Sequence, residues 1–459
     1  MRLKLINLKE DNSKKGLFGA ITQPPLCHAF LAAMIPEDLD IDVEIIDEQI
    51  EDVDLDMECD AVALSLTTHG ARRCYQYARW FKKRGRTVIL GGYHTTLCPD
   101  EAQKFADSIV IGEAENVWPE LLRDLVDGNL KPRYQSDTIA DLSKTPLPRR
   151  DLLDMEKYRV PNIIITSRGC PYMCSYCASS KIYGKYRRRD PDAIIKEIKS
   201  LRFKKIKDTP LMFADDEFFT PKDQALDLMK RIEPLNISWF VQATVPALCD
   251  KELMKAASES GCAGIMVGLE SFNPETHKYI KKFQNYSKDI NKSVEYANSL
   301  GIPVAALLIS GLDTDNEESL NKTVDILLKS RFALFNFSVL RAYPGTPLYE
   351  NLLEQGRVTK RWWLKKITKD DPNYHVQDDV KAFFKPKHFT PLDLQIKTLE
   401  FNVKASNIFR RNRFKTIISN LYTTKTKIPF LRVIASEVVM QWQYWTSLRK
   451  LRKIKMNQE

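Results

Sequence analysis

Residues 163–177 read IIITSRGCPYMCSYC, and the rest of the chain is best understood from this stretch outward. Its β-branched beginning, Ile163 to Ser167, predicts a short buried strand. Three cysteines follow at the spacing C-x3-C-x2-C: Cys170, Cys174 and Cys177. The three thiols therefore stand on the loop that leaves the carboxyl end of this strand. We interpret them as the three protein ligands of a metal site.

Two kinds of metal site compete for this loop. Three thiolates can hold three irons of a cubane [4Fe–4S] cluster and leave the fourth iron open to another ligand. Structural zinc takes four N or S ligands, usually from two paired clamps, and the sequence has no second clamp nearby. The next cysteines, Cys249 and Cys262, fall in other predicted elements. We therefore favour the cluster over zinc or free thiols.

Length and composition indicate a folded protein of two or three domains. The chain has 459 residues, of which 43% are hydrophobic and 28% charged. No secretory signal is recognisable, and no run approaches the roughly 18 apolar residues of a membrane span. Nine cysteines, an odd number, favour a reducing compartment over a disulfide framework. We expect a cytoplasmic protein.

The first part of the chain predicts a doubly wound α/β domain. Strand-like runs at 3–8, 43–47, 61–66, 88–90 and 108–111 alternate with helical patterns, which implies a parallel sheet. Ligands of such sheets bind beyond the carboxyl ends of the strands. Small or polar residues that suit close backbone approach and hydrogen bonding stand there, although ordinary turns would look similar. They are Ser65, Thr67, Gly91, Gly92, His94, Thr95, Gly112 and Glu113.

The second part predicts a partial parallel barrel of six strand–helix repeats, between residues 163 and 340. Chemistry in such folds collects at the carboxyl ends of the strands. Asp215 and Asp216 follow the second strand, where they suit either a cationic ligand group or a helix cap. Glu270 and Ser271 follow the fourth, and a carboxylate there can accept hydrogen bonds from two hydroxyls. Gln242 lies on the third strand, as a ligand-binding amide or a core glutamine.

The tail is helical and basic. Residues 401–459 carry 13 Lys and Arg against 2 acidic residues, so the net charge of +10 belongs to this region. Trp442, Trp445, Leu448 and Leu451 follow one another at three-residue spacing among basic side chains. This pattern suits docking to an anionic membrane surface, or a helix packed on the barrel with its charges in water. No nucleic-acid-binding module is recognised.

The cysteine loop, with the aromatic Tyr176 before its third cysteine, resembles the signature of the radical S-adenosylmethionine (radical SAM) enzymes. The segments GGYHTT and IVIGEAE resemble the cobalamin-binding domain that precedes the barrel in the B12-binding branch of that family. The D-x-H-x-x-G box, which supplies a lower cobalt ligand in other cobalamin proteins, is absent.

The resemblance implies roles for the candidate residues. The three cysteines would bind the cluster, and Tyr176, Asp215, Asp216, Gln242, Glu270 and Ser271 would bind SAM. The small polar residues of the first domain would bind cobalamin. The implied organisation is a Rossmann-like cobalamin-binding domain (1–140), a linker (141–156), a radical SAM partial TIM barrel (157–345) and a basic helical C-terminal region (346–459).

The resemblance also implies an activity. A 5′-deoxyadenosyl radical would activate an unactivated carbon of a hydrophobic, lipid-like or natural-product substrate, and methylcobalamin would methylate it. Non-methylating cyclisation, ring rearrangement or carbon–carbon coupling is the alternative within enzymes, and a corrinoid- or metal-binding sensor is the alternative outside them. We also expect an electron donor such as flavodoxin or ferredoxin, and peripheral contact with the inner membrane face through the basic C-terminal helix.

Overall fold

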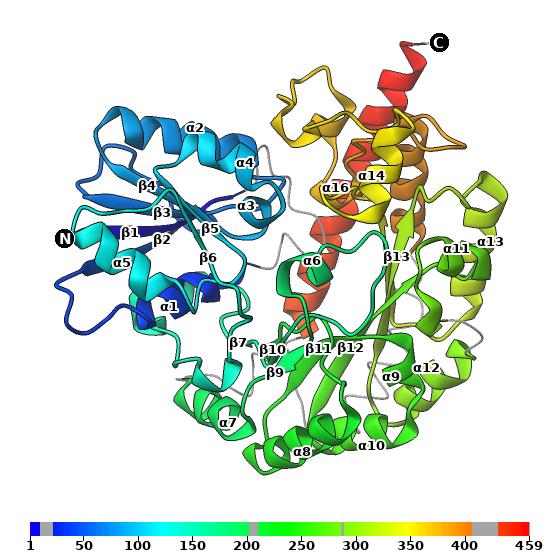
Figure 1. Ribbon diagram of the computed structural model, residues 1–459. Helices are drawn as coiled ribbons and strands as arrows, with labels where there is room; N and C mark the ends of the chain where they lie inside the picture. The colour runs from blue at the N-terminus through cyan, green and yellow to red at the C-terminus, as the bar shows by residue number, and fades with distance from the viewer. Residues whose placement is uncertain (10–21, 202–209, 286–288, 406–429, 459) are drawn as a thin grey trace.

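The computed structural model describes residues 1–9, 22–201, 210–285, 289–405 and 430–458. Figure 1 shows two parallel sheets side by side, with C-terminal segments above the second sheet. This arrangement confirms the predicted α/β class, with a doubly wound sheet followed by a partial barrel and helices. In the tail, which the sequence predicts to be helical, a helix is present over 391–405, and residues 406–429 lie outside the described ranges.

The first sheet is parallel throughout, with strand order β2-β1-β3-β4-β5-β6. Leu5 of β1 lies level with Ile45 of β2 on one side and Ala63 of β3 on the other. The strands are β1 (Arg2–Asn7), β2 (Asp42–Asp47), β3 (Ala61–Ser65), β4 (Thr87–Gly91), β5 (Ser108–Ile111) and β6 (Arg133–Gln135). The helices are α1 (Leu26–Ala33), α2 (Ala71–Lys83), α3 (Tyr93–Leu97), α4 (Pro99–Ala102) and α5 (Trp118–Val126).

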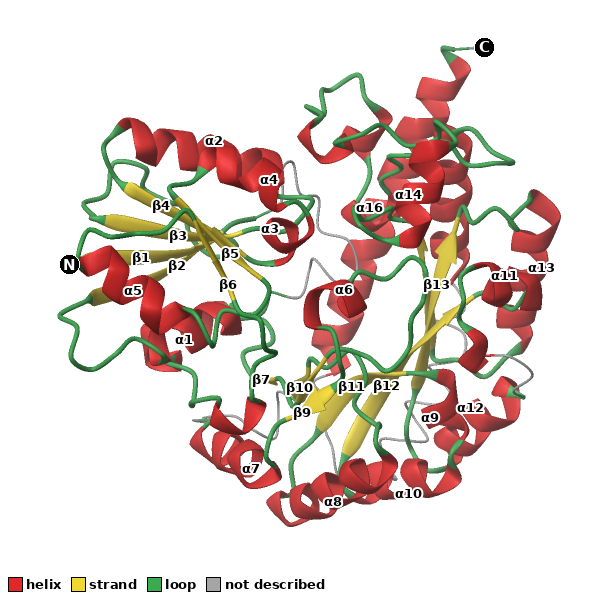
Figure 2. Ribbon diagram, in the orientation of Figure 1, coloured by secondary structure: helices red, strands yellow, loops and turns green. Residues whose placement is uncertain are grey.

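The second sheet is also parallel, with strand order β14-β13-β12-β11-β10-β7, so its neighbours follow chain order. Its strands are β7 (Ile163–Ile164), β10 (Leu211–Phe213), β11 (Trp239–Ala243), β12 (Cys262–Glu270), β13 (Val304–Ser310) and β14 (Leu334–Val339). Helices flank it on the outside (Figure 2). They include α7 (Pro191–Ser200), α8 (Lys222–Ile232), α9 (Val245–Cys249), α10 (Lys251–Glu259), α11 (Pro274–Tyr279), α12 (Ile290–Ser299) and α13 (Glu317–Lys329).

The strand predicted at 163–167 is divided in the structure. β7 ends at Ile164, and β8 (Ser167–Arg168) belongs to a separate two-stranded antiparallel ribbon with β9 (Arg187–Arg188). The cause is Asp215, whose carboxylate accepts hydrogen bonds from the backbone N–H groups of Thr166, at 2.7 Å, and Ser167, at 2.6 Å. These donors therefore turn toward a side chain, and the chain bends as it enters the cysteine loop.

The C-terminal region joins the two sheets. One continuous apolar core contains Leu64 of the first sheet, Val339 of β14 and Trp363. The Trp363 indole donates a 2.8 Å hydrogen bond to Glu101 of α4. Two further helices are α14 (Pro347–Glu354) and α16 (Phe430–Met456). No helix in the described part of the chain is long and apolar enough to span a membrane.

Candidate active site

The β8–β9 ribbon closes the segment 169–186, which carries the three cysteines and helix α6 (Ser179–Tyr183). Cys170, Cys174 and Cys177 are all partly exposed and free. Burial raises the pKa of Cys170 to about 12 and that of Cys177 to about 11, and it also raises the pKa of Cys174. Metal binding requires thiolates, so loading this loop at neutral pH would release protons.

Three thiolates on one loop form the donor set of a group with several metal atoms. Among the described residues, no three Cys, His, Asp or Glu side chains converge closely enough to hold one metal ion. Zinc would need all its ligand atoms within about 2.3 Å of one centre. A cluster in which each thiolate binds a different iron has no such requirement. The Gln284 amide lies 3.6 Å from Cys174 Sγ and can donate to that sulfur.

The acidic turn after β10 contributes three carboxylates with different surroundings. Asp215 is buried and braces the entrance to the cysteine loop, whereas Asp216 is exposed and accepts a hydrogen bond from the Ser179 hydroxyl. Glu217 is fully buried, and its Oε1 accepts a 2.9 Å hydrogen bond from the Phe219 amide. Thr244 hydrogen-bonds the same carboxylate. A buried carboxylate in this position suits a cationic group such as the amino group of SAM.

Glu217 is a residue that our sequence reasoning did not single out, although it is the third acid of the same turn. Burial raises its pKa. A bound ammonium group would compensate the buried charge of its ionised form, as opposite charges do. Asp215, in contrast, is occupied by the backbone before the cysteine loop, so the structure gives it a structural task and leaves its predicted contact with SAM unsupported.

Glu270 ends β12 and adopts a left-handed backbone conformation, with φ of 64°, at an irregularity in the strand register. Its Oε1 accepts hydrogen bonds from the Tyr176 hydroxyl, at 2.8 Å, and from Lys282 Nζ, at 2.6 Å. The structure thus brings together two predicted residues, Tyr176 of the cysteine loop and Glu270. Lys282 was not predicted, because nothing in its local sequence marks it as buried.

The other two predicted SAM residues lie at the same edge of the barrel. Gln242 is partly buried on β11. Its neighbours Val241 and Ala243 are buried in the apolar core between this sheet and the helices outside it. Strand alternation therefore directs Gln242 toward the barrel interior. Ser271 is buried, and its hydroxyl accepts a 3.1 Å hydrogen bond from the Asn273 amide.

A pocket of about 990 Å³, including its open mouth, lies at the carboxyl ends of β3, β4 and β5. Five of the predicted cobalamin residues line it: Ser65, Gly91, Gly92, Gly112 and Glu113. Much of its wall is apolar and includes Phe30, Leu31, Met34, Ile89, Val110 and Trp118. Cys27, Tyr93 and Thr96 also line it and were missed by the sequence analysis.

Three predicted residues do not reach this pocket. His94 is buried and lies 3.2 Å from both Thr68 Oγ1 and Glu101 Oε1, with its ring against Trp363. Thr95 donates to the Gly91 carbonyl. Thr67 is exposed and accepts a hydrogen bond from Gly70. Tertiary packing turns these side chains elsewhere, so their predicted contact with cobalamin has no support in the geometry.

The pocket fits a corrinoid with an apolar tail. Gly92 has φ of 91°, and a Cβ there would approach Ser65 Oγ and the Leu66 amide to 3.0 Å, so only glycine keeps this turn. A Cβ added to Gly112 would meet nothing within 4 Å, which leaves this backbone accessible. Ser65, Thr96 and the glycine turns would hold polar edges of the ligand, and the apolar wall would hold its heterocyclic tail.

Segments beside the cysteine loop complete the pocket. Ile165 and Arg168, before the first cysteine, and Ile182 and Tyr183, after the third, lie in its wall. The hydroxyls of Tyr93 and Tyr183 are 2.6 Å apart and link α3 of the first domain to α6. The corrinoid-type pocket and the three-thiol loop are therefore adjacent.

Comparison with known proteins covers both domains. The family model described as the radical SAM superfamily matches residues 164–327, and the B12 binding domain model matches residues 23–122. Bacteriochlorophyllide d C-8(2)-methyltransferase of Chlorobaculum tepidum is 28% identical over 94% of this chain and 95% of its own. An uncharacterised methyltransferase of Pyrococcus horikoshii is 30% identical over 85% of this chain and 89% of its own.

A more distant relative bears the name of a different activity. The anaerobic magnesium-protoporphyrin IX monomethyl ester cyclase of Rubrivivax gelatinosus is 23% identical over 72% of this chain and 66% of its own. Among solved structures, the radical SAM methyltransferase TsrM of Kitasatospora setae superposes with a TM-score of 0.68 over 99% of both chains, at 16% identity, which supports the shared fold. This chain therefore belongs to the radical SAM superfamily, in the branch that carries a B12 binding domain before the barrel.

Proposed function

We propose that this enzyme is a cobalamin-dependent radical SAM C-methyltransferase that acts on a hydrophobic small molecule. The observation that carries the proposal is the shared wall between the two sites: Arg168 and Tyr183 flank the three cysteines and also line the corrinoid-type pocket. When bound, the cluster with SAM supplies a 5′-deoxyadenosyl radical, and the corrinoid supplies a methyl group. A substrate carbon held between the two sites would be within reach of both.

The chain's own residues would bind, orient and exclude water. Cys170, Cys174 and Cys177 would hold the cluster. The buried carboxylate of Glu217 would accept hydrogen bonds from the amino group of SAM, and Glu270, held in place by Lys282, would accept them from its ribose hydroxyls. Holding reactants in such fixed geometry is the main contribution that a protein makes to this chemistry.

Labelled SAM tests the proposal directly. Anaerobically reconstituted enzyme is incubated with SAM deuterated in its methyl group, a reductant and a lipid and pigment extract. We expect a product that carries the labelled methyl group, together with 5′-deoxyadenosine. The Cys174→Ala variant should form neither. Formation of 5′-deoxyadenosine without any labelled product would rule out methyl transfer.

A second candidate is a non-methylating radical reaction such as ring formation. The similarity to the magnesium-protoporphyrin ester cyclase supports keeping it. The same incubation separates the two, because methylation replaces a substrate hydrogen with the labelled methyl group, whereas ring formation gives a product without the label.

We also propose two partners. An electron donor such as flavodoxin or ferredoxin would reduce the cluster. An anionic membrane would bind the exposed face of α16, where the side chains of Trp442 and Trp445 are 66% and 47% exposed. The Arg449 guanidinium lies 4.6 Å from the centre of the Trp445 ring, so this face combines aromatic and basic groups. Such a position would bring a lipid-like substrate to the enzyme.

A further inference from the structure

The ribbon that closes the cysteine loop places two positive charges opposite each other. In the β8–β9 pairing, Arg168 is the direct cross-strand partner of Arg187. Like charges in this position destabilise a strand pair. Because segment 169–186 leaves and returns through this ribbon, separation of the two strands would open the neck of the loop that carries the three cysteines.

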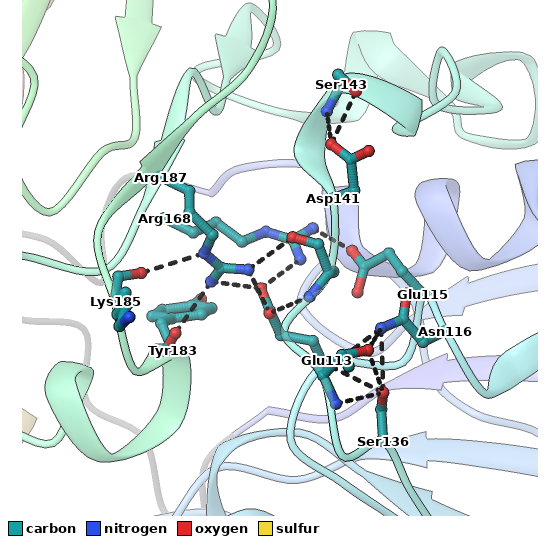
Figure 3. Close-up of polar contacts among 12 residues, drawn as sticks. Glu113, Glu115, Asn116, Ser136, Asp141, Ser143, Arg168, Tyr183, Lys185 and Arg187 are labelled. Carbon is teal, nitrogen blue, oxygen red and sulfur yellow. Dashed lines mark hydrogen bonds and ion pairs between the residues drawn. The ribbon is translucent and has the colours of Figure 1, made fainter.

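A carboxylate from the first domain lies between these arginines (Figure 3). Glu113 Oε1 accepts from Arg168 Nη1 at 2.9 Å, and Glu113 Oε2 accepts from Arg187 Nη1 at 2.7 Å. Glu115 forms a second ion pair with Arg168. Glu113 and Glu115 belong to the turn after β5, which begins at Gly112 of the pocket.

The four charged side chains are largely buried. Their exposed fractions are 14% for Arg168, 15% for Arg187, 8% for Glu113 and 15% for Glu115. Burial by itself would raise the pKa of Glu113, but the hydrogen bonds from Arg187 and Arg168 hold it below its ordinary value. The carboxylate is therefore ionised at neutral pH, and the arginines depend on it for compensation, because an uncompensated buried charge is costly.

Arg187 has anchors besides Glu113. It donates to the carbonyl oxygens of Ala140, at 2.9 Å, Tyr183, at 3.0 Å, and Lys185, at 3.1 Å. Arg168 is paired with the two glutamates. Loss of the Glu113 charge would therefore leave Arg187 in place and push Arg168, two residues before Cys170, away from it.

We propose that Glu113 is a positioning residue that clamps the neck of the cysteine loop and sets it against the corrinoid pocket. The barrel thus depends on the first domain for the shape of its own cysteine loop. That the positioned loop holds a cluster, and that the pocket holds a corrinoid, rests on the proposed function. The role differs from direct contact with cobalamin, which the family resemblance implies for this residue.

Hydrogen–deuterium exchange tests the clamp in the full-length, metal-free and ligand-free protein. In Glu113→Gln, we expect amide exchange in residues 166–169 and 186–189 to rise about tenfold, while β11 and β13 exchange as in the wild type. Glu115→Gln should give a smaller rise in the same segments. The control is Asp38→Asn, which breaks an exposed bidentate pair with Arg123 elsewhere in the first domain. This control variant should leave amide exchange at the neck unchanged.

Binding of hydroxocobalamin distinguishes a clamp from a direct ligand. Unchanged exchange at the neck in both glutamate variants would overturn the proposal, and so would a Glu113→Gln variant that loses hydroxocobalamin affinity while its neck exchanges normally. A destabilised Glu113→Gln fold would be visible as faster exchange throughout, and Glu115→Gln then decides the question.

The functional measurement is the yield of methylated product per 5′-deoxyadenosine in the reconstituted enzyme. Glu113→Gln should still form 5′-deoxyadenosine, but its yield of methylated product per 5′-deoxyadenosine should fall about 10- to 100-fold, because a displacement of about 1 Å can cost this much. An unchanged yield would overturn the link to catalysis. If the wild type forms no methylated product, the proposed function fails, whereas the exchange result still decides the clamp.

Discussion

Asp315 is a buried carboxyl group in the turn after β13. Its Oδ2 accepts hydrogen bonds from the Gly311 and Leu312 amides, both at 2.9 Å. Burial outweighs these hydrogen bonds and raises its pKa from 3.8 to about 7. Between these two pH values the folded protein keeps a proton that the unfolded chain has released. Asp315 therefore makes the free energy of unfolding fall as pH rises through this window.

The Asp315→Asn variant should remove this contribution. Asparagine keeps an oxygen for the two amides but does not ionise, so we expect the urea midpoint to decline less between pH 5 and pH 8 than in the wild type. At pH 8 the variant should be the more stable protein. Asp52→Asn, at an exposed position, is the control and should follow the wild type. If the urea midpoint of Asp315→Asn fell as steeply with pH as that of the wild type, the pH dependence would not come from Asp315.

Lys282 is a second buried charge, and it compensates Glu270. Both side chains are less than 10% exposed, and their atoms are 2.6 Å apart. Lys282→Met should lower the free energy of unfolding by about 3 kcal/mol, because it leaves the Glu270 carboxylate buried without a cation. The measurement is chemical unfolding at pH 7. The neighbouring Lys281→Met is the matched control, since Lys281 is exposed, and equal stability of the two variants would refute the pairing.

At the scale of elements, the short strands around the cysteine loop have weak local signals. β8 and β9 contain two residues each, and their pairing depends on Asp215 at one end and Glu113 between the arginines. Neither carboxylate is near the ribbon in sequence. This is why the sequence pattern predicts one continuous strand at 163–167, whereas the structure has two.

Helix α16 shows how spacing alone misplaces a helix face. Four residues at three-residue spacing rotate by about 60° per step, so Trp442 and Leu451 lie on nearly opposite sides of an ideal helix. Leu448 and Leu451 are accordingly buried, as is Tyr444, whose hydroxyl donates to Asp379 at 3.0 Å. The two tryptophans face outward. The expected apolar stripe is therefore divided between the core and the surface.

The Trp442→Ala, Trp445→Ala double variant tests membrane docking. It should reduce co-sedimentation with anionic vesicles several-fold and leave the melting temperature nearly unchanged, because both side chains are exposed. Leu448→Ala is the contrasting variant: it removes a buried side chain and should destabilise the fold by about 2–5 kcal/mol. Vesicle binding that is unaffected by the double substitution would exclude this face as the docking surface.

At the scale of the whole molecule, the pocket lies where the first domain meets the cysteine-loop segment. Cys27 is exposed within it, and its Sγ lies 3.1 Å from His28 Nδ1. The pocket walls around this exposed residue would raise the pKa of its thiol through desolvation, but the contact with His28 brings that pKa below its ordinary value. Since thiolates are the reactive form, Cys27 should be the fastest thiol to react outside the three-cysteine loop.

Alkylation followed by peptide mass spectrometry tests the pocket. In the metal-free protein we expect iodoacetamide to label Cys27, and the pH at which the labelling rate reaches half its maximum should lie below 9.0. Cys98, which is partly exposed and whose pKa burial raises to about 12, should react much more slowly. Hydroxocobalamin should protect Cys27 and leave the rate at Cys98 unchanged. Labelling of Cys27 at the same rate with and without hydroxocobalamin would place the corrinoid elsewhere.

The sequence by itself determined the features that depend on local pattern. Strand-like runs that alternate with helical patterns predicted the two parallel sheets, because parallel strands need such helical connections between them. The spacing of Cys170, Cys174 and Cys177 identified the loop, since three ligands within eight residues need no distant partner. The glycine turns at Gly92 and Gly112 marked the pocket edge, because their backbone requirements are also local.

Only the tertiary structure decided which side chains meet. His94, which follows a predicted strand end, turns into the core beside Trp363, whereas Cys27, which the sequence did not mark, faces the pocket. Glu113 pairs with arginines that are 55 and 74 residues away along the chain. The directions in which these side chains point are set by desolvation and by charge compensation between distant segments. These energies arise only after the two sheets have come together.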